Sequence, residues 1–341
     1  ALSDDTDEPR FYTLKMGVNE TFGRSQLNFH YVTFLKDEDG DPFHPDAFAP
    51  EGLAYIDDKL YISTQGTDPD TDPSIKVFDL ETGFEYPGAL LLPDYYCPRG
   101  DTGVRADSSF KGLTISPDGK KLWTAVEYAL KQDGPLNAPS RMLKFDLDSR
   151  RPLDEFVYER YAANGLVALI ALDDDGTFLS LERNPSSEDR NIRLYEVLTQ
   201  GSLNVRGIDA LADSDGDTYG IEEPVSRTLV ADFDDLGLGS NYEAMAIEVN
   251  RHKYRLVLIS DNELSPTRAT RFAALEVNIN DKIVLAEPEN ETPEFVDDND
   301  VEESPLRLRG EASDPAIWVH PDDPSQSLVI GTLSDGGLAT F

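Results

Sequence analysis

The sequence has few of the residues on which metal and redox chemistry commonly depend. Cys97 is the single cysteine, so the chain forms no internal disulfide and no thiolate metal site. The histidines are scattered and show no zinc-site spacing, at His30, His44, His252 and His320. The sequence also lacks the GxSxG, P-loop and GxGxxG motifs, which excludes the commonest hydrolase and nucleotide-binding signatures.

Basic residues and long apolar runs are scarce as well. Lysine and arginine number 30 against 66 acidic residues, a formal net charge of −36. A chain of this charge repels nucleic acids and anionic membranes, and no apolar run approaches the roughly 20 residues of a membrane span. We therefore expect neither as a partner. The acidic excess fits a salty or extracellular setting, or carboxylates that collect hard cations such as Ca²⁺, and the two explanations are compatible.

Short strand-like runs separated by DG, DDG, PDG and NP turns dominate the sequence. They recur as a unit of three or four strands that begins near residues 51, 111, 166 and 243. Two copies open with EGLAYI and KGLTIS. Repeats of this length predict an all-β fold, a β-propeller of four-stranded blades.

The two ends of the sequence resemble parts of a blade. The runs FYTLKMGV and FHYVTFL resemble two outer strands, and DPAIWVHP, SLVIGTL and GGLATF resemble three inner strands. Propellers often close by combining strands from both termini, so we expect six blades, with five or seven as alternatives. We expect residues 1–286 to form the propeller, 287–304 an acidic linker, and 305–341 a further segment that either completes the last blade or begins another domain.

The repeat places polar residues at two recurrent points. Inner strands of a propeller run the same way, and each second strand returns to the end where the first began, so both points meet at one mouth of the ring. Glu51, Lys111 and Glu243 begin first strands. The residues that end second strands are Gln65, Glu127, Glu182 and Asp261. The spacing thus predicts a ring of mostly acidic side chains at this mouth.

Such a ring has two interpretations. The carboxylates either cap strands and pair with backbone amides and arginines, or they hold a metal or a substrate. Oxygen ligands without histidine or thiolate favour Ca²⁺ or Mg²⁺ over zinc. A phosphate substrate also needs cationic partners, for which arginine is well suited. The candidates are Lys111, Arg141, Arg183 and Arg227.

Five stretches in order resemble the phytase-like family described by "esterase-like activity of phytase". They are APEGLAYIDDKLYISTQG, FKGLTISPDGKKLWTAVEYALKQDG, GTFLSLERN, NYEAMAI and RLVLISDNE, within a likeness that covers about residues 10–285. The resemblance implies a β-propeller, usually secreted or periplasmic, whose acidic residues support phosphoester hydrolysis. Its acidic positions fall on Glu51, Glu127, Glu182 and Glu243. The family usually has glutamate where this chain has Gln65 and Lys111, which weakens a metal ring or adapts it to an anion.

The final segment, DPAIWVHPDDPSQSLVIGTLSDGGLATF, resembles the opening of a β-propeller phytase, a calcium-dependent phosphatase of inositol phosphates. Asp314 falls on that family's calcium-binding aspartate. The rest of such a domain is absent from this sequence, so the resemblance implies a parent protein with a phytase domain in cis.

Together these features predict an extracellular or periplasmic propeller that hydrolyses phosphate esters with Ca²⁺, or assists a phytase that does. Glu127 and Glu182 are the expected catalytic residues. The expected metal ligands are Glu51, Glu127, Glu182, Glu243, Asp261 and Asp314. Two alternatives are a non-catalytic propeller that binds ligands or partners beside a phytase, and a lactonase-like hydrolase with one Ca²⁺ in the tunnel.

Overall fold

The computed structural model is built almost entirely of β-strands. It describes residues 2, 6–17, 26–45, 47–65, 72–106, 108–184, 191–212, 223–238, 241–250, 253–260, 270–277, 284–285, 316–318 and 328–331. The helices in these ranges are two three-residue 3₁₀ turns, η1 (Asp94–Tyr96) and η2 (Lys131–Asp133). None of the helices in the described ranges has the length or apolar character needed to cross a membrane.

Four sheets are continuous in sequence and correspond to the four repeats. Each has four antiparallel strands in chain order, as expected when short turns join neighbouring strands. The first two are β3 (Pro50–Ile56), β4 (Lys59–Thr64), β5 (Ser74–Asp79) and β6 (Glu85–Tyr86), then β7 (Phe110–Ile115), β8 (Lys121–Val126), β9 (Ser140–Asp146) and β10 (Arg151–Tyr158). The next two are β11 (Gly165–Ala171), β12 (Thr177–Arg183), β13 (Ile192–Leu198) and β14 (Ser226–Asp232), then β15 (Tyr242–Asn250), β16 (Lys253–Ser260), β17 (Phe272–Val277) and β18 (Val284–Leu285).

A fifth sheet joins both ends of the chain. Its strand order is β19-β20-β1-β2, and β20 pairs with β1 from Tyr12↔Gly331 to Lys15↔Leu328. The bounds are β1 (Arg10–Gly17), β2 (Gln26–Phe34), β19 (Ala316–Trp318) and β20 (Leu328–Gly331). The N-terminal strands are thus the outer pair of a blade and the C-terminal strands its inner pair.

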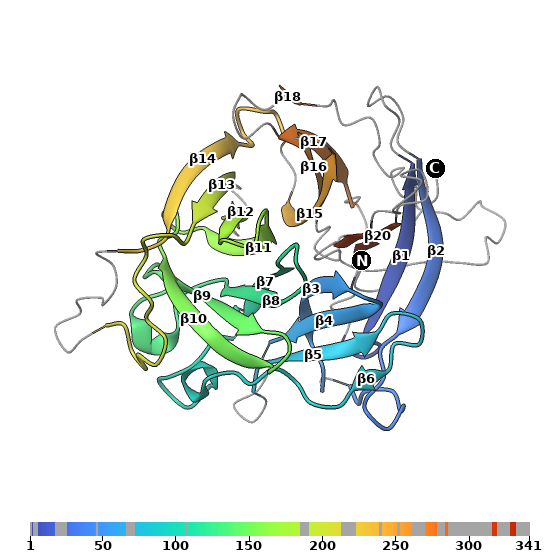
Figure 1. The fold of residues 1–341 in the computed structure, drawn as a ribbon, viewed down its shortest axis with the longest axis horizontal. Helices are drawn as coiled ribbons and strands as arrows, with labels where there is room; N and C mark the ends of the chain where they lie inside the picture. Colours follow the sequence, from blue (N-terminus) through green and yellow to red (C-terminus); the bar gives the residue numbers. More distant parts are fainter. Residues whose placement is uncertain are drawn as a thin grey trace, which may run out of the picture.

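The five sheets form a closed ring. Their first strands touch in the order β3, β7, β11, β15 and β19, and β19 returns to β3. Figure 1 views the ring along its central axis, with β3, β7 and β11 near the middle and β2, β10 and β14 at the rim.

The all-β propeller is confirmed, but the expected number of six blades is wrong. The described residues form five sheets, because the chain has only four complete repeats and its two ends add one shared blade. The predicted domain boundaries stay a prediction, since residues 287–304 lie outside the described ranges.

The hydrophobic core lies between neighbouring blades. One cluster joins Tyr61 and Val77 of one sheet to Leu113 and Phe145 of the next. Others join β7–β10 to β11–β14, and β11–β14 to β15–β18. A fourth joins the terminal blade to β3–β5. Because all seven residues of β11 are buried, the inner strand reads as an unbroken apolar run instead of an alternating one.

Candidate functional site

Each of four inner strands has a β-bulge at the same place near its start. A bulge adds one residue opposite a regular partner strand and re-aims the side chain there. The extra residues include Lys111, Val167 and Glu243, and in β3 the bulge spans Glu51. The register shifts lie between Pro50/Leu53, Phe110/Gly112, Leu166/Ala168 and Tyr242/Ala244. The repeated charged positions of the sequence are therefore bulge positions, and Val167 is their uncharged counterpart.

The glycine that follows Lys111 lets neighbouring inner strands approach closely. A Cβ atom on Gly112 would lie 3.0 Å from the Cβ atom of Leu169 and 3.1 Å from Cδ2 of Leu166, both in the next blade. These distances are shorter than ordinary van der Waals contacts, so a side chain here would require the neighbouring blade to shift by a few tenths of an ångström. The "KGL" segment thus combines a bulged charge with a tight contact between blades.

The bulged charges meet residues at the ends of the second strands, where Arg183 is the last residue of β12 and Glu127 follows β8. We call Glu51, Lys111, Glu127, Arg183 and Glu243 the mouth cluster. Nζ of Lys111 lies 3.3 Å from Oε2 of Glu51 and 3.8 Å from Oε2 of Glu243. Nη1 of Arg183 lies 2.8 Å from Oε1 of Glu243 and donates a 2.7 Å hydrogen bond to Asn241. The cluster is nearly buried, and the Lys111 side chain, at 19% exposure, is its most accessible ion-paired member.

Glu127 is the most deeply buried carboxyl group of this cluster. Its exposed fraction is 3%. Burial raises its pKa above the usual value of 4.5, although the charges of Lys111 and Arg183 oppose the rise. The space for this side chain comes from Gly165, where a Cβ atom would lie 2.6 Å from both Cγ and Oε1 of Glu127. A carboxyl group that holds its proton more tightly can act as a proton donor.

Lys111 is held in its charged form. Burial by itself would lower the pKa of this amine, but Glu51, Glu127 and Glu243 outweigh that effect and raise the pKa well above 10.5. The side chain therefore carries a positive charge at any physiological pH. Because Lys111 is the most exposed of the ion-paired side chains, it is the cation that a ligand would contact at the mouth.

Two further side chains at the mouth were missed from the sequence. Tyr128 follows Glu127, and its ring atom Cζ would lie 3.0 Å from a Cβ atom on Gly165, so both side chains end beside the same point. The Tyr128 side chain is buried, and its hydroxyl group has no hydrogen-bond partner among the described residues. Burial and the charge of Glu127 raise its pKa to about 12. Tyrosine within an apolar run gives no sequence signal for such a role.

Arg160 is the second missed residue. Its guanidinium group lies over the Tyr128 ring, 4.9 Å from the ring centroid. It donates hydrogen bonds to the carbonyl oxygens of Asn164, Leu136 and Ala138, and no carboxylate pairs with it among the described contacts. Arg160 therefore fixes the Tyr128 ring from one side.

Glu182 lies outside the mouth cluster, contrary to the sequence prediction. Leu166 pairs with Glu182 as Phe110 pairs with Val126, so the residue equivalent to Glu127 is Arg183. The sequence prediction placed the end of this second strand one residue too early. Because side chains alternate along a strand, Glu182 lies on the opposite face from the mouth cluster. There its carboxylate accepts hydrogen bonds from the Tyr158 hydroxyl at 2.8 Å and the Tyr161 amide at 2.7 Å, and it pairs with Arg227.

Arg227 belongs to this second group and not to the mouth. Besides its ion pair with Glu182, its guanidinium carbon lies 4.5 Å from the centroid of the Tyr195 ring. Burial raises the pKa of Glu182 above 4.5, while Arg227 opposes the rise. The Glu182 carboxylate is fully buried and has no surface for a ligand. Its pair with Arg227 links β12 to β14 within one blade, and its hydrogen bond from Tyr158 of β10 links it to the neighbouring blade.

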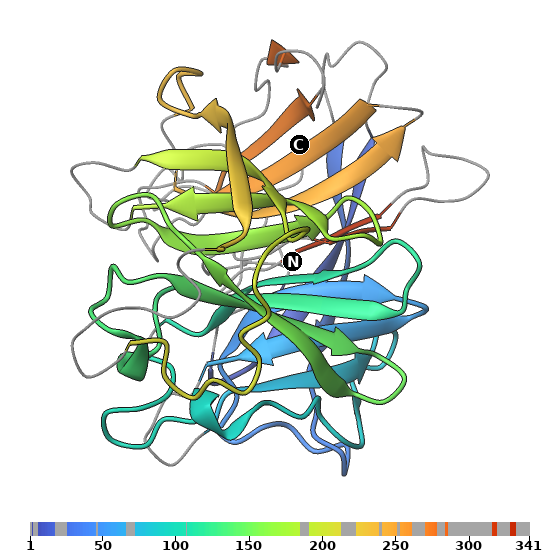
Figure 2. The same ribbon diagram turned by 60° about the vertical axis from the view of Figure 1, so that its left-hand side comes forward.

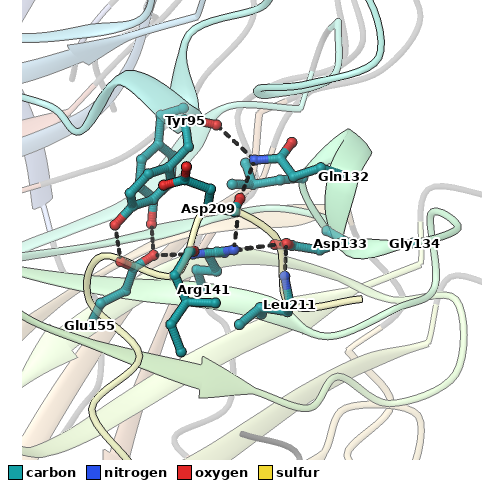
Figure 3. Close-up of polar contacts among 12 residues, drawn as sticks. Tyr95, Gln132, Asp133, Gly134, Arg141, Glu155, Asp209 and Leu211 are labelled. Atoms are coloured by element: carbon teal, nitrogen blue, oxygen red, sulfur yellow. Dashed lines mark hydrogen bonds and ion pairs between the residues drawn. The ribbon is translucent and has the colours of Figure 1, made fainter. Parts of the chain in front are cut away.

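Arg141 is also a structural residue, contrary to its expected role in substrate binding. Its side chain is fully buried and forms ion pairs with Asp133 at 2.6 Å and with Glu155 at 3.0 Å (Figure 3). Tyr96 donates a 2.6 Å hydrogen bond to Glu155, and the carbonyl of Ile208 accepts one from Arg141 at 2.9 Å. Residues 199–212 of the β13–β14 connection, yellow in Figure 2, cross the outer edge of the β7–β10 sheet. Arg141 therefore anchors a loop to a blade.

The described mouth residues do not fit a Ca²⁺ site. Calcium takes six to eight oxygen ligands, whereas Lys111 and Arg183 already occupy the space among these carboxylates. No group of three or more His, Cys, Asp or Glu side chains in the described ranges is arranged to hold a metal ion. Two predicted ligands, Asp261 and Asp314, lie outside the described residues.

Comparison with known proteins gives one family. The family model "Phytase-like: Esterase-like activity of phytase" matches residues 1–264, more than half of the chain. No curated protein matches.

Solved structures show distant likenesses. They include hydrazine synthase of Kuenenia stuttgartiensis (12% identity, 78% of this chain and 62% of that one, TM-score 0.34) and the GH43 β-1,3-galactosidase BT3683 (12%, 90% and 98%, TM-score 0.41). A third is the periplasmic gluconolactonase PpgL of Pseudomonas aeruginosa (12%, 92% and 74%, TM-score 0.37). The chain spans less than two thirds of the hydrazine synthase chain. Likenesses this distant say nothing about activity.

Proposed function

Because the chain belongs to the phytase-like family of "esterase-like activity of phytase", we propose that it hydrolyses phosphate esters at the mouth cluster. One observation carries the proposal. A buried carboxyl group with a raised pKa, Glu127, lies within the electrostatic reach of two cations, Lys111 and Arg183. A proton donor assists departure of the leaving oxygen, and cations stabilise the charge that develops on the phosphate, so this arrangement suits hydrolysis of a phosphate ester.

The mouth residues divide the reaction between them. Lys111, the most exposed of the paired residues, contacts the phosphate oxygens, and Arg183 holds Glu243 in place. A water oxygen attacks phosphorus and forms the new P–O bond while the bond to the leaving oxygen breaks. Glu127 gives its proton to the leaving oxygen, and the proton released by the attacking water restores the carboxyl group. Atoms and charge balance without a further reactant.

Calcium dependence is a separate part of the proposal. The family resemblance and the acidic composition support it, and its untested candidate ligands are Asp261 and Asp314. No step of the reaction above passes through the ion, because the described mouth residues do not fit it.

The test is hydrolysis of p-nitrophenyl phosphate, bis-p-nitrophenyl phosphate and phytate, with Ca²⁺ and with chelator. We expect Glu127→Gln to lower kcat about 100-fold or more, since general acid catalysis contributes roughly 10²–10⁴-fold. Glu182→Gln tests the sequence prediction of a second catalytic carboxylate. Its place between blades makes us expect lower stability and unchanged kcat. Calcium-dependent rates would support the ion's part, and equal rates in chelator would remove it.

Glu81→Gln is the matched control, because Glu81 is exposed in the turn between β5 and β6, at the end of the ring away from the mouth. Its kcat should equal that of the unaltered protein. Turnover that survives Glu127→Gln would disprove the role of this residue, and a folded protein that turns over none of the three esters would disprove hydrolysis.

A second candidate function is a non-catalytic propeller that binds phosphate-bearing ligands beside a phytase domain. Lys111 and Gln65 support it, since each replaces a carboxylate usual in the family. Binding of inorganic phosphate with no turnover of any ester would favour this function.

We also propose an extracellular or periplasmic location and a phytase domain in cis, both on the family resemblance. Fractionation of the source cells and sequencing of the intact parent protein test them directly.

A further inference from the structure

The charges of the mouth cluster limit the substrate that it can accept. The two cations are balanced by the carboxylates of Glu51 and Glu243, so the cluster has no net positive charge even when Glu127 is protonated. Lys111 is already shared between Glu51 and Glu243, and Arg183 is bound to Glu243 and Asn241. A cation paired in this way offers an incoming anion only part of its potential, and adding a doubly charged group would leave excess negative charge in a buried place.

Two other donor groups lie at the mouth. The Arg160 guanidinium group is charged and donates to three carbonyl oxygens, whereas the Tyr128 hydroxyl is neutral. The Tyr128 side chain is 6% exposed, and its hydroxyl lacks a hydrogen-bond partner within the described part of the chain. It ends beside Glu127 over Gly165. A buried hydroxyl without a partner is costly, so a ligand oxygen that accepts its hydrogen bond satisfies the site. Neutral donors suit an oxygen that carries a partial charge, such as those of a monoanion.

The whole molecule acts in the same direction. The chain's formal charge of −36 creates a negative potential that lowers the local concentration of anions, by a factor that grows exponentially with the charge of the anion. A polyphosphorylated substrate is penalised most, and a monoanion least.

From these observations, and resting on the proposed function, we propose that the mouth cluster selects phosphodiesters, which carry one negative charge, over phosphomonoesters and polyphosphates. Tyr128 is a further substrate-binding residue in this proposal, and its hydroxyl donates to a non-bridging oxygen of the diester. Arg160 is a positioning residue that holds the Tyr128 ring through the 4.9 Å stacking contact.

The first test compares kcat/KM for bis-p-nitrophenyl phosphate with that for p-nitrophenyl phosphate and phytate, in chelator at constant ionic strength near pH 8. The two nitrophenyl esters share a leaving group, and the monoester is a dianion at this pH because its second pKa is about 6. We expect the diester to be preferred by about tenfold or more. A preference for the monoester or phytate would overturn the proposal.

A charge change at the mouth should alter this preference. Glu51→Gln removes one negative charge beside Lys111, so the monoester should gain about fivefold or more relative to the diester. Glu81→Gln makes the same charge change away from the mouth and should leave the ratio unchanged. An unchanged ratio in Glu51→Gln, or equal changes in both variants, would overturn the proposal.

Substitution of Tyr128 distinguishes an effect on substrate binding from an effect on stability. Tyr128→Phe removes a hydroxyl without a described partner, so the melting temperature should stay the same or rise. The value of kcat/KM for the diester should fall about tenfold, and Arg160→Met should produce a smaller fall in folded protein. Unchanged diester kinetics in Tyr128→Phe would remove this residue from the site.

A protein without turnover would disprove the proposed function but would not decide the charge preference. Isothermal titration with dimethyl phosphate and inorganic phosphate then tests it. Tighter binding of dimethyl phosphate, weakened in Tyr128→Phe, would support the preference. Equal or tighter binding of inorganic phosphate would overturn it.

Discussion

At the scale of single residues, the proposed acid Glu127 depends on its burial and on the space that a neighbouring glycine leaves for it. Burial lets the Glu127 carboxyl group keep its proton to a higher pH than usual, although the charges of Lys111 and Arg183 oppose this effect. Gly165 leaves the space in which that side chain lies. The position of Glu127 therefore depends on the absence of a Cβ atom at residue 165.

Replacing Gly165 with alanine should lower activity more than stability. The new Cβ atom would lie 2.6 Å from Cγ and Oε1 of Glu127, the movable end of a side chain, so Glu127 is displaced. We expect kcat to fall about tenfold or more while the melting temperature changes by only a few degrees. Gly112→Ala is the contrast, since its Cβ would press on Leu169 across two blades and should mainly lower the melting temperature. Normal kcat in Gly165→Ala would contradict this account of the site.

The protonation of Glu127 should appear in the pH dependence of stability. Its pKa in the folded protein exceeds the usual 4.5, so its contribution to stability is complete below pH 4.5 and is lost as pH rises through the folded pKa. Glu127→Gln does not titrate. The melting temperature of this variant, relative to the unaltered protein, should therefore increase from pH 4 toward neutral pH. A difference that is constant or falls over this range would show that the carboxyl pKa is not raised.

At the scale of elements, the sequence predicts the repeat better than it predicts the side chains. The "EGL" and "KGL" starts identified the inner strands, and Glu51, Lys111 and Glu243 do meet at one mouth. Glu182 was misplaced because a one-residue error in aligning second strands reverses the face of every side chain. Arg141 could not be assigned, because Asp133 and Glu155 reach it through the folding of separate strands and loops.

The buried Arg141 network should matter for stability and not for catalysis. Arg141→Met leaves the carboxylates of Asp133 and Glu155 buried without their cation, and breaking such a pair costs about 3–5 kcal/mol. Urea unfolding measures this loss. Lys120→Met is the control, because Lys120 forms an exposed pair with Asp118, and its loss should cost less than about 1 kcal/mol. Equal midpoints for the two variants would contradict the structural role of Arg141.

At the scale of the whole molecule, closure of the ring determines whether the C-terminal strands belong to the same domain as the rest of the propeller. The sequence indicated blade-like strands at both ends, but it could not show that they are one blade, because pairing between residues more than 300 positions apart leaves no local pattern. The composition of residues 287–304 predicted a linker, and the sequence left open whether the segment after it completes the last blade or begins another domain. The pairing of β20 with β1 favours the first alternative, in which the last strands are part of the same ring.

Truncation distinguishes these two views. A chain that ends at residue 286 lacks β19 and β20, which leaves the inner edge of β1 unpaired and breaks the contacts from β15 and β3 to β19. An open, unpaired strand edge favours aggregation. We expect this chain to melt at least several degrees lower than the full chain and to form oligomers in size-exclusion chromatography. A chain that ends at residue 331 keeps both strands and should behave as the full chain does. If the chain ending at 286 is monomeric with an unchanged melting temperature, then residues 1–286 are an independent propeller, and the terminal strands contribute nothing to its closure.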